Sequence, residues 1–237
     1  MFADLVWPPV SPMSGRPVSA PGELDAEDWT KITFLDAPWC ARCGVPFDYP
    51  SFEGVDCPAC SAKPPPWGRA RAAMVYDEHS RGLPLALKHA GRTDGLAAFG
   101  RWMARAGREF LPEADALVPV PLHPSRLRQR RFNQSLLLAR AVSRASGVAV
   151  EPHALARVRK TGTQGGLSAR SRTRNVAGAF RVRDRSKVEG RRLVIIDDVH
   201  TTGATLAACA RALSRAGAAE VNALTLARVV KPVDPTK

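Results

Sequence analysis

The sequence has no apolar run long enough to cross a membrane. Its longest stretch without Asp, Glu, Lys or Arg is Val199 to Ala210, only 12 residues, whereas a transmembrane helix needs about 20. The first 22 residues lack a basic segment followed by an apolar core, and prolines interrupt them, so they do not resemble a signal peptide. We therefore expect a cytoplasmic protein without membrane insertion.

Lysine and aromatic residues are scarce. Aromatic residues make up 6% of the chain, which disfavours an extended platform for stacking bases. Of the 35 basic residues, 28 are Arg. Coding bias can produce such an excess, but the planar guanidinium also suits phosphate oxygens better than an ammonium does.

The charge is unevenly distributed. Residues 1–66 carry four basic and nine acidic side chains, whereas residues 67–237 carry 31 and 13. Coding bias does not explain this change of sign. The net charge of +13 therefore indicates a polyanionic or phosphorylated partner for the larger, C-terminal part.

Composition divides the 237 residues into three parts. Residues 1–36 combine several prolines with an acidic patch, and we expect a flexible N-terminal tail. Residues 37–66 contain four of the five cysteines and end in three prolines. Residues 67–237 are long enough for one domain with a substantial core.

This main domain alternates short apolar runs with Ala- and Leu-rich helical patterns, which is typical of an α/β fold with a mainly parallel sheet. Strands are predicted at 71–76, 116–120, 193–197 and 221–226. Helices are predicted around 83–88 and at 94–110, 133–144 and 204–216.

Four cysteines form two pairs of the C-x2-C type. Cys40 and Cys43 are separated by 13 residues from Cys57 and Cys60, which lets four thiolates converge on one tetrahedral ion. We expect a structural zinc ribbon that requires its metal to fold. An iron–sulfur centre is the alternative metal site. Two disulfides are disfavoured, because they do not suit a cytoplasmic protein.

The most informative segment is an apolar strand that ends in Asp197 and Asp198 and continues into Thr201-Thr-Gly-Ala-Thr205 at the start of a helix. In parallel sheets, ligands bind at this end of the strands. Backbone N–H groups and the helix dipole favour a phosphate there, whereas a carboxylate suits neutral hydroxyls or a metal. Phosphate and hydroxyls together indicate a ribose phosphate.

The segment resembles the 5-phosphoribosyl-1-pyrophosphate (PRPP) motif of type I phosphoribosyltransferases. The resemblance implies that Asp197 and Asp198 contact the ribose hydroxyls. It also implies a 5'-phosphate loop made of Thr201, Thr202, Gly203, Ala204 and Thr205. His200 occupies a variable position of the motif, and we assign it no catalytic role.

Further blocks extend the resemblance along nearly the whole chain. After the cysteine pairs come Leu87-Lys-His-Ala-Gly91, Val118-Pro-Val-Pro-Leu122, Arg130-Arg-Phe-Asn-Gln134, Arg157-Val-Arg-Lys160, Gln164-Gly-Gly-Leu-Ser168 and Arg174-Asn-Val176. Their order is similar to that of the ComF (ComFC-like) family of competence proteins. Two departures are Arg131, where Gly is commoner, and His89, where Tyr is commoner.

The resemblance implies a zinc ribbon joined to a type I phosphoribosyltransferase-like domain that binds PRPP with Mg²⁺. Val120 lies in a segment that resembles the pyrophosphate loop, and Lys88 is a further candidate for this ligand. Residues 160–176 have the composition of a mobile lid. The family's role implies DNA uptake during natural transformation, with single-stranded DNA and other competence proteins as partners.

Residues 123–185 contain 15 Lys or Arg and two acidic residues, which supports backbone-directed binding of single-stranded DNA. A solvated basic face is the alternative. The candidate contacts are Arg126, Arg128, Arg130, Arg131, Arg170 and Arg174, with Arg157 and Arg159 beside them.

Two other functions remain open. The protein could be an active phosphoribosyltransferase that transfers phosphoribose to a nucleobase-like acceptor in nucleotide metabolism. The acidic N-terminal third could instead dock a protein partner through the metal site. The sequence does not identify an acceptor base, an oligomeric state or a protein partner.

Overall fold

A parallel four-stranded sheet forms the centre of the protein. The computed structural model describes residues 8–230 except 51, 53, 90–94 and 161–168. In spatial order the strands are β1 (Ala70–Val75), β6 (Glu220–Arg228), β5 (Arg192–His200) and β2 (Ala116–Pro119). All neighbouring pairs are parallel, so their carboxyl ends lie at one edge of the sheet.

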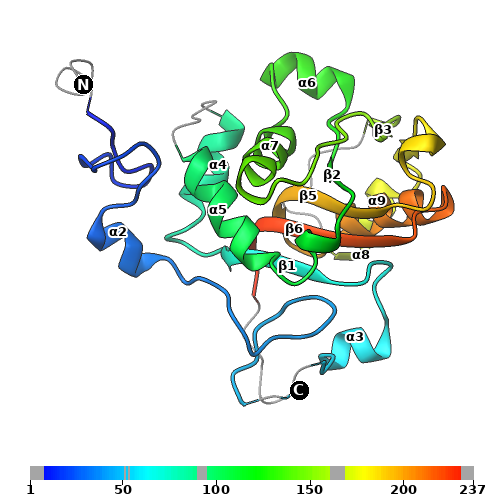
Figure 1. Cartoon of the computed structure of the whole chain (residues 1–237), viewed down its shortest axis with the longest axis horizontal. Helices are drawn as coiled ribbons and strands as arrows, with labels where there is room; N and C mark the ends of the chain where they lie inside the picture. The colour runs from blue at the N-terminus through cyan, green and yellow to red at the C-terminus, as the bar shows by residue number, and fades with distance from the viewer. Residues whose placement is uncertain (1–7, 51, 53, 90–94, 161–168, 231–237) are drawn as a thin grey trace.

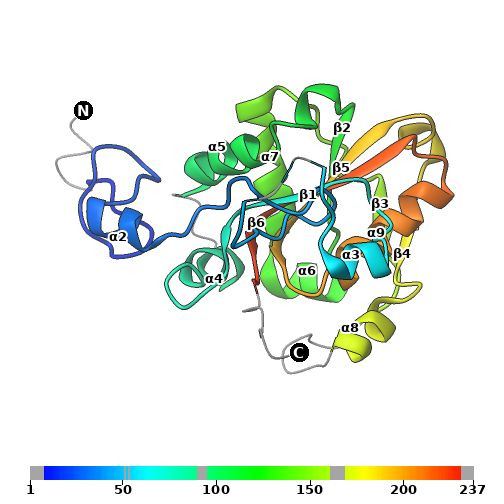
Figure 2. The same cartoon turned by 90° about the horizontal axis from the view of Figure 1, so that it is seen from below.

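Helices cover both faces of this sheet (Figures 1 and 2). On one face lie α5 (Leu96–Ala106) and α7 (Gln134–Ser146), and α9 (Ala204–Arg215) lies on the other. Alternate residues of β5 enter the two apolar cores: Leu193 and Ile195 pack on the α9 side, and Val194 and Ile196 on the α5 and α7 side. This two-sided burial explains why the β5 sequence is a continuous apolar run.

Smaller elements lie around the sheet and α9. They are the antiparallel strand pair of β3 (Leu155–Arg157) and β4 (Phe180–Val182), α8 (Ala169–Val176), α4 (Gly82–His89), α6 (Pro124–Arg130) and the short 3-10 helices Leu111–Glu113 and Arg185–Lys187. The C-cap of α6 is Arg131, whose φ of 64° is left-handed. Glycine adopts this conformation without strain, which explains the commoner Gly at this position.

The described part of the N-terminal segment contains a short helix and contacts the main domain. Within the segment predicted as a flexible tail, α2 (Ala26–Lys31) begins at Asp25, whose side chain accepts a hydrogen bond from the Asp28 N–H. Phe34 then pairs with Met74 of β1 and packs edge-on against Trp102 of α5, with ring centroids 5.1 Å apart. The end of this segment is therefore docked on the main domain.

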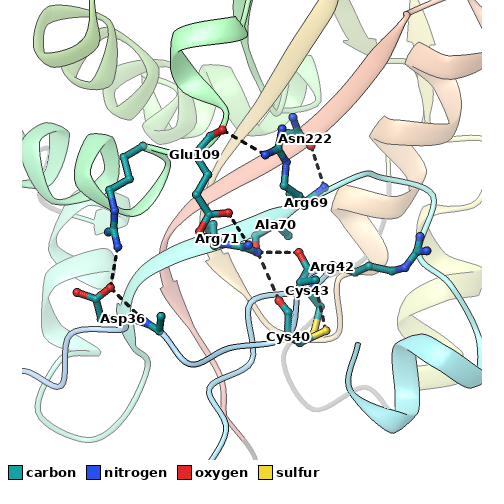
Figure 3. A network of polar contacts seen from close by, with 12 residues as sticks. Asp36, Cys40, Arg42, Cys43, Arg69, Ala70, Arg71, Glu109 and Asn222 are labelled. Carbon is teal, nitrogen blue, oxygen red and sulfur yellow. Dashed lines mark hydrogen bonds and ion pairs between the residues drawn. The ribbon is translucent and has the colours of Figure 1, made fainter. Parts of the chain in front are cut away.

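Residues 37–66, called the cysteine segment below, include α3 (Pro58–Ala62) and lie beside β1 (Figure 1). Buried Arg71 joins them to the sheet by donating to the carbonyl oxygens of Cys40, at 3.4 Å, and Ala41, at 3.0 Å. Figure 3 shows this network. The segment is thus packed against the sheet edge, and its connection to the main domain is not the proline linker alone.

The predicted α/β architecture is confirmed, including all four strands of the sheet. The helix predicted at 94–110 is shorter, because α5 ends before Gly107. The predicted lid is only partly described: 161–168 lie outside the described residues, and α8 follows them. No helix in the described part of the chain is long and apolar enough to span a membrane.

Candidate functional site

The carboxyl ends of β5 and β2 lie side by side. Val118 and Pro119 of β2 pair with Ile195 and Ile196 of β5. The next residue, Val120, donates its N–H to the carbonyl oxygen of Ile196 at 2.9 Å. The segment predicted as a pyrophosphate loop, Val118 to Leu122, thus starts within β2, and its Val120 is bonded to the residue that precedes the acidic pair.

Asp197 is held by a residue that the sequence did not indicate. Its Oδ1 accepts a hydrogen bond from the Ser135 hydroxyl at 2.9 Å. Ser135 lies in the first turn of α7, whose N-cap, Asn133, donates from Nδ2 to the carbonyl oxygen of Val120 at 3.0 Å. The sequence predicted a helix from residue 133, but only the strand order brings Ser135 to Asp197.

Asp198 is in a different environment. It is buried with 5% exposure, and its Oδ1 accepts from the Val199 N–H at 2.9 Å. Because successive residues of an extended strand point to opposite faces, the two carboxylates leave β5 in different directions.

The phosphate loop predicted at Thr201 to Thr205 connects β5 to α9. Thr201 and Thr202 are exposed, whereas Gly203 and Ala204 are buried. Gly203 is the N-cap of α9 with a φ of 71°, and no side chain caps the helix there. The first N–H groups of a 12-residue helix thus lie next to two exposed hydroxyls, an arrangement that favours an anion.

We predict that Gly203→Ala destabilises the protein. The left-handed backbone alone costs a non-glycine residue about 1–2 kcal/mol. An added Cβ would also lie 2.9 Å from both His200 Nε2 and Trp67 Cη2. We therefore expect the free energy of unfolding, measured with urea, to fall by more than the backbone cost.

Gly190→Ala is the matched control. Gly190 has the same φ of 71°, but an added Cβ would have nothing within 4 Å. Its substitution should therefore cost the backbone term alone, about 1–2 kcal/mol. Equal losses for the two variants would show that the contact with His200 and Trp67 contributes nothing.

His200 does not act as an acid or base at neutral pH in this fold. Burial, reinforced by the positive charge of Arg228, lowers the pKa of His200 to about 3. The ring is therefore neutral above that pH and serves as a hydrogen-bonding group. In the unfolded chain it would bind a proton near pH 6.5, so its contribution to stability is lost as the pH falls from about 6.5 towards 3.

The basic residues predicted to bind nucleic acid fall on two helices. Arg126, Arg128 and Arg130 lie in α6, which follows the carboxyl end of β2, and Arg131 ends this helix. Arg174 is exposed in α8. For Arg170 in α8 and Lys88 in α4, the structure describes the backbone alone.

Two other arginines of the predicted groove, Arg157 and Arg159, make contacts within the protein. Arg157 is 7% exposed and lies over the Phe180 ring, 5.3 Å from its centroid. Arg159 donates from Nη2 to the carbonyl oxygens of Asn175, at 3.0 Å, and Ala177, at 2.6 Å. It thus binds the end of α8 and its following turn.

A hollow of about 430 Å³ lies at the C-terminal end of α9, beside β4. Buried Phe180 and Ala212 contribute apolar surface to it. Its charged lining residues are three exposed arginines, Arg181, Arg185 and Arg215. This basic hollow is at the other end of α9 from Gly203.

The four cysteines converge as their spacing predicted. Cys40, Cys43, Cys57 and Cys60 are all buried, and their sulfur atoms lie within 4.8 Å of one another. The Sγ atoms of Cys43 and Cys57 are 3.8 Å apart, which is about the edge of a tetrahedron with metal–sulfur bonds of ~2.3 Å. The Cys57 N–H also donates to Cys40 Sγ at 3.2 Å.

The electrostatics of this cluster favour a cation. Hydrogen bonding to the Cys43 side chain, and then to the N–H groups of Cys43 and Cys57, lowers the pKa of Cys40 to about 4. The hydrogen bond with Cys40 and burial raise the pKa of Cys43. Burial and the neighbouring Cys40 charge raise the pKa of Cys60 to about 12. Further thiolates are therefore unfavourable unless a metal ion balances them.

Comparison with known families agrees with the strand order and the loop. Residues 133–235 match the family model described as "Phosphoribosyl transferase domain". The match contains the acidic pair, the Thr/Gly loop and α9. Residues 133–235 are therefore part of a phosphoribosyltransferase-type fold, and a four-cysteine segment precedes them in the chain.

Similar curated proteins identify the family. The chain is 40% identical over 197 residues to DNA utilization protein YhgH of Salmonella typhi, covering 81% of this chain and 84% of that protein. It is 30% identical over 212 residues to Competence protein F of Haemophilus influenzae, covering 81% and 85%. For Competence protein ComFC of Bacillus subtilis, identity is 31% over 162 residues, covering 67% and 63%. The chain belongs to this ComF-like family of competence proteins.

One similar solved structure is a glutamine PRPP amidotransferase from B. subtilis complexed with ADP and GMP. It has 24% sequence identity and a TM-score of 0.41, and the overlap covers 59% of this chain and 30% of that one. The assignment of the fold rests on the sheet order and the family model.

Proposed function

We propose that the protein binds PRPP with Mg²⁺ at the carboxyl ends of β5 and β2. The observation that carries this proposal is the junction of β5 and α9, where two carboxylates precede an uncapped helix N-terminus. The loop of Thr201 to Thr205 would hold the 5'-phosphate. Asp197 and Asp198 would accept hydrogen bonds from the ribose hydroxyls, and the backbone after Val120 would face the pyrophosphate.

Charge explains this division of roles. Two carboxylates beside a phosphate would repel it, whereas they are good acceptors for hydroxyl groups. When bound, Mg²⁺ would neutralise the pyrophosphate oxygens. Isothermal titration calorimetry of the full chain with PRPP and Mg²⁺ tests the proposal, and the absence of binding at millimolar PRPP would exclude it.

For the cysteine segment we propose a structural zinc ion. The donor set of four thiols suits a soft or borderline metal, and the closed arrangement leaves no position for a substrate. When bound, the ion would supply charge balance and cross-link the two cysteine pairs.

We further propose that the protein binds single-stranded DNA and acts in DNA uptake. The names of its relatives, DNA utilization protein and competence protein, support this role. So does the position of α6, whose arginines follow the carboxyl end of β2 beside the proposed PRPP site. The basic hollow at the end of α9 offers a second contact for a polyanion.

Binding of single-stranded DNA should weaken steeply with salt. For single strands, each neutralised phosphate contributes about −0.7 to the slope of log K against log salt concentration. The variant Arg128→Gln/Arg131→Gln removes two exposed cations of the α6 region, so the slope should become shallower by about 1.4. Fluorescence anisotropy of a labelled oligo(dT) at different NaCl concentrations measures it.

The variant Arg140→Gln/Arg144→Gln is the matched control, because it removes two exposed cations from α7. This helix runs away from the carboxyl edge after Ser135. The slope of this variant should equal that of the wild type. Equal changes in both variants would show that net charge alone, and not the α6 region, controls the binding.

An active phosphoribosyltransferase is the second candidate function. The adjacency of Asp197 and the Val120 segment favours it, because a ligand bound there would extend from ribose to pyrophosphate. In that reaction a base nitrogen forms a bond to C1' of PRPP as the bond to the pyrophosphate oxygen breaks. Release of pyrophosphate in the presence of a panel of nucleobases distinguishes turnover from binding alone.

A further inference from the structure

Arg228 connects the cysteine segment to the sheet. It is the last residue of β6 and pairs with His200, the last residue of β5. Its Nη1 donates to the carbonyl oxygen of Cys43, and its Nη2 lies 3.6 Å from Cys43 Sγ. One guanidinium therefore contacts both the backbone and the sulfur of a candidate metal ligand.

The same guanidinium contacts His200. Arg228 Nη1 lies 3.3 Å from His200 Nδ1, and His200 is only 5% exposed. Because Arg can only donate, Nδ1 is the acceptor, and the proton of the neutral ring is on Nε2. The orientation of the ring is thus determined by Arg228.

The other side of the His200 ring faces the phosphate loop. Its Nε2 would lie 2.9 Å from a Cβ added to Gly203, and so would Cη2 of Trp67. Trp67 packs edge-on against His200, with centroids 5.8 Å apart, and its Nε1 donates to the carbonyl oxygen of Arg42 at 3.2 Å. Two series of contacts therefore lead from the first cysteine pair to Gly203, the N-cap of α9. One runs through Arg228 and His200, and the other runs through Trp67.

We propose that Arg228 and His200 are positioning residues that couple metal binding at the cysteines to phosphate binding at Thr201 to Thr205. A bound metal would fix the position of Cys43, and with it the carbonyl oxygen and sulfur that Arg228 contacts. Arg228 then holds His200, and His200 holds the backbone of Gly203 in its left-handed conformation. Loss of the metal releases this chain of contacts and loosens the loop.

The effect on ligand binding in this inference rests on the proposed PRPP site. The coupling between the cysteines and the loop is measured separately. Amide hydrogen exchange of a peptide spanning residues 198–206 reports the loop without any ligand. Titration with PRPP and Mg²⁺ reports the binding. Both are measured on the full chain loaded with zinc and after zinc removal by a chelator, with the zinc content of each sample determined.

In the wild type, zinc removal should accelerate exchange of the loop and weaken PRPP binding about tenfold, the usual size of coupling between two sites. Arg228→Met loaded with zinc should match the zinc-free wild type in both measurements. Further zinc removal should then change PRPP affinity less than about twofold. Arg42→Gln is the control: Arg42 lies in the same segment, but its side chain binds Asp56, so it should respond as the wild type does.

A merely structural role for Arg228 predicts a different result. The variant would then be less stable but would keep wild-type loop exchange and PRPP affinity when loaded with zinc, and this would overturn the proposal. Unchanged loop exchange on zinc removal from the wild type would also overturn it. If the wild type binds no PRPP, the proposed ligand is wrong, while hydrogen exchange still decides the coupling. If Arg228→Met does not fold, His200→Gln and Arg228→Lys provide the same comparison.

Discussion

Replacing Asp197 and Asp198 together by Asn should abolish PRPP binding and leave the protein folded. Asn has nearly the same volume as Asp, keeps one oxygen acceptor and removes the charge. A hydrogen bond to a charged group contributes about 1.5–3 kcal/mol, so the loss of both charges should weaken binding by a factor of about 10² to 10⁴. Isothermal titration calorimetry with PRPP and Mg²⁺ measures this loss.

Asp184→Asn is the matched control. Asp184 is an exposed carboxylate that accepts hydrogen bonds from Ser186 and lies away from the β5 junction, at the start of a 3-10 helix. Its variant should bind PRPP as the wild type does. Circular dichroism should show native helix content for both variants. A folded double variant with wild-type affinity would show that these carboxylates do not hold the ribose.

The elements that position the site were predictable because their sequences carry strong local signals. The strand predicted at 193–197 is the core of β5, and the helix predicted at 204–216 corresponds to α9 within one residue. Both are bounded by turn residues with clear backbone preferences, such as Gly203. The convergence of the four cysteines followed from their spacing alone.

The missed elements have weak local signals. β3 and β4 contain three residues each, which is too short for any periodicity to show. In α6, five of the seven residues are polar or basic, and no residue of the helix is buried, so its sequence was interpreted only as a basic patch. The burial of Arg157 depends on the pairing of β3 with β4, where it lies over Phe180, and could not be predicted.

Contacts between segments that are distant in the chain could not be predicted from the sequence either. Ser135 reaches Asp197 because α7 starts where β5 ends, and Arg228 reaches His200 through the strand register. No local pattern marks either residue. The sequence therefore predicted the ligand-binding groups, whereas the residues that hold them required the strand order.

Arg71 is the buried charge that joins the cysteine segment to the sheet (Figure 3). Its side chain is 3% exposed, and Nη2 lies 2.6 Å from Glu109 Oε2. Its Nε also donates to Glu109 Oε1 at 3.3 Å, so the pair is bidentate. The guanidinium lies over the Trp39 ring, 4.8 Å from its centroid. These contacts, together with the carbonyl oxygens of Cys40 and Ala41, compensate for the cost of burying the charge.

We expect Arg71→Met to lower the free energy of unfolding by about 1–3 kcal/mol, the usual cost of leaving buried acceptors without their donor, because the Glu109 side chain that remains is 32% exposed. Methionine fills a similar volume but leaves the carbonyl oxygens of the cysteine segment without their donor. Urea unfolding of the zinc-loaded protein, followed by circular dichroism, measures the loss. The cysteine segment should also become sensitive to proteolysis, because its anchor to β1 is lost.

Arg192→Met is the matched control, because Arg192 pairs with Glu113 at 3.4 Å while both side chains are more than half exposed. Exposed pairs contribute at most about 1 kcal/mol, so this variant should be close to the wild type. Arg71→Met/Glu109→Leu should be more stable than Arg71→Met alone, since the remaining carboxylate no longer lacks its partner. A loss below about 1 kcal/mol for Arg71→Met would show that the network in Figure 3 orients the cysteine segment without stabilising it.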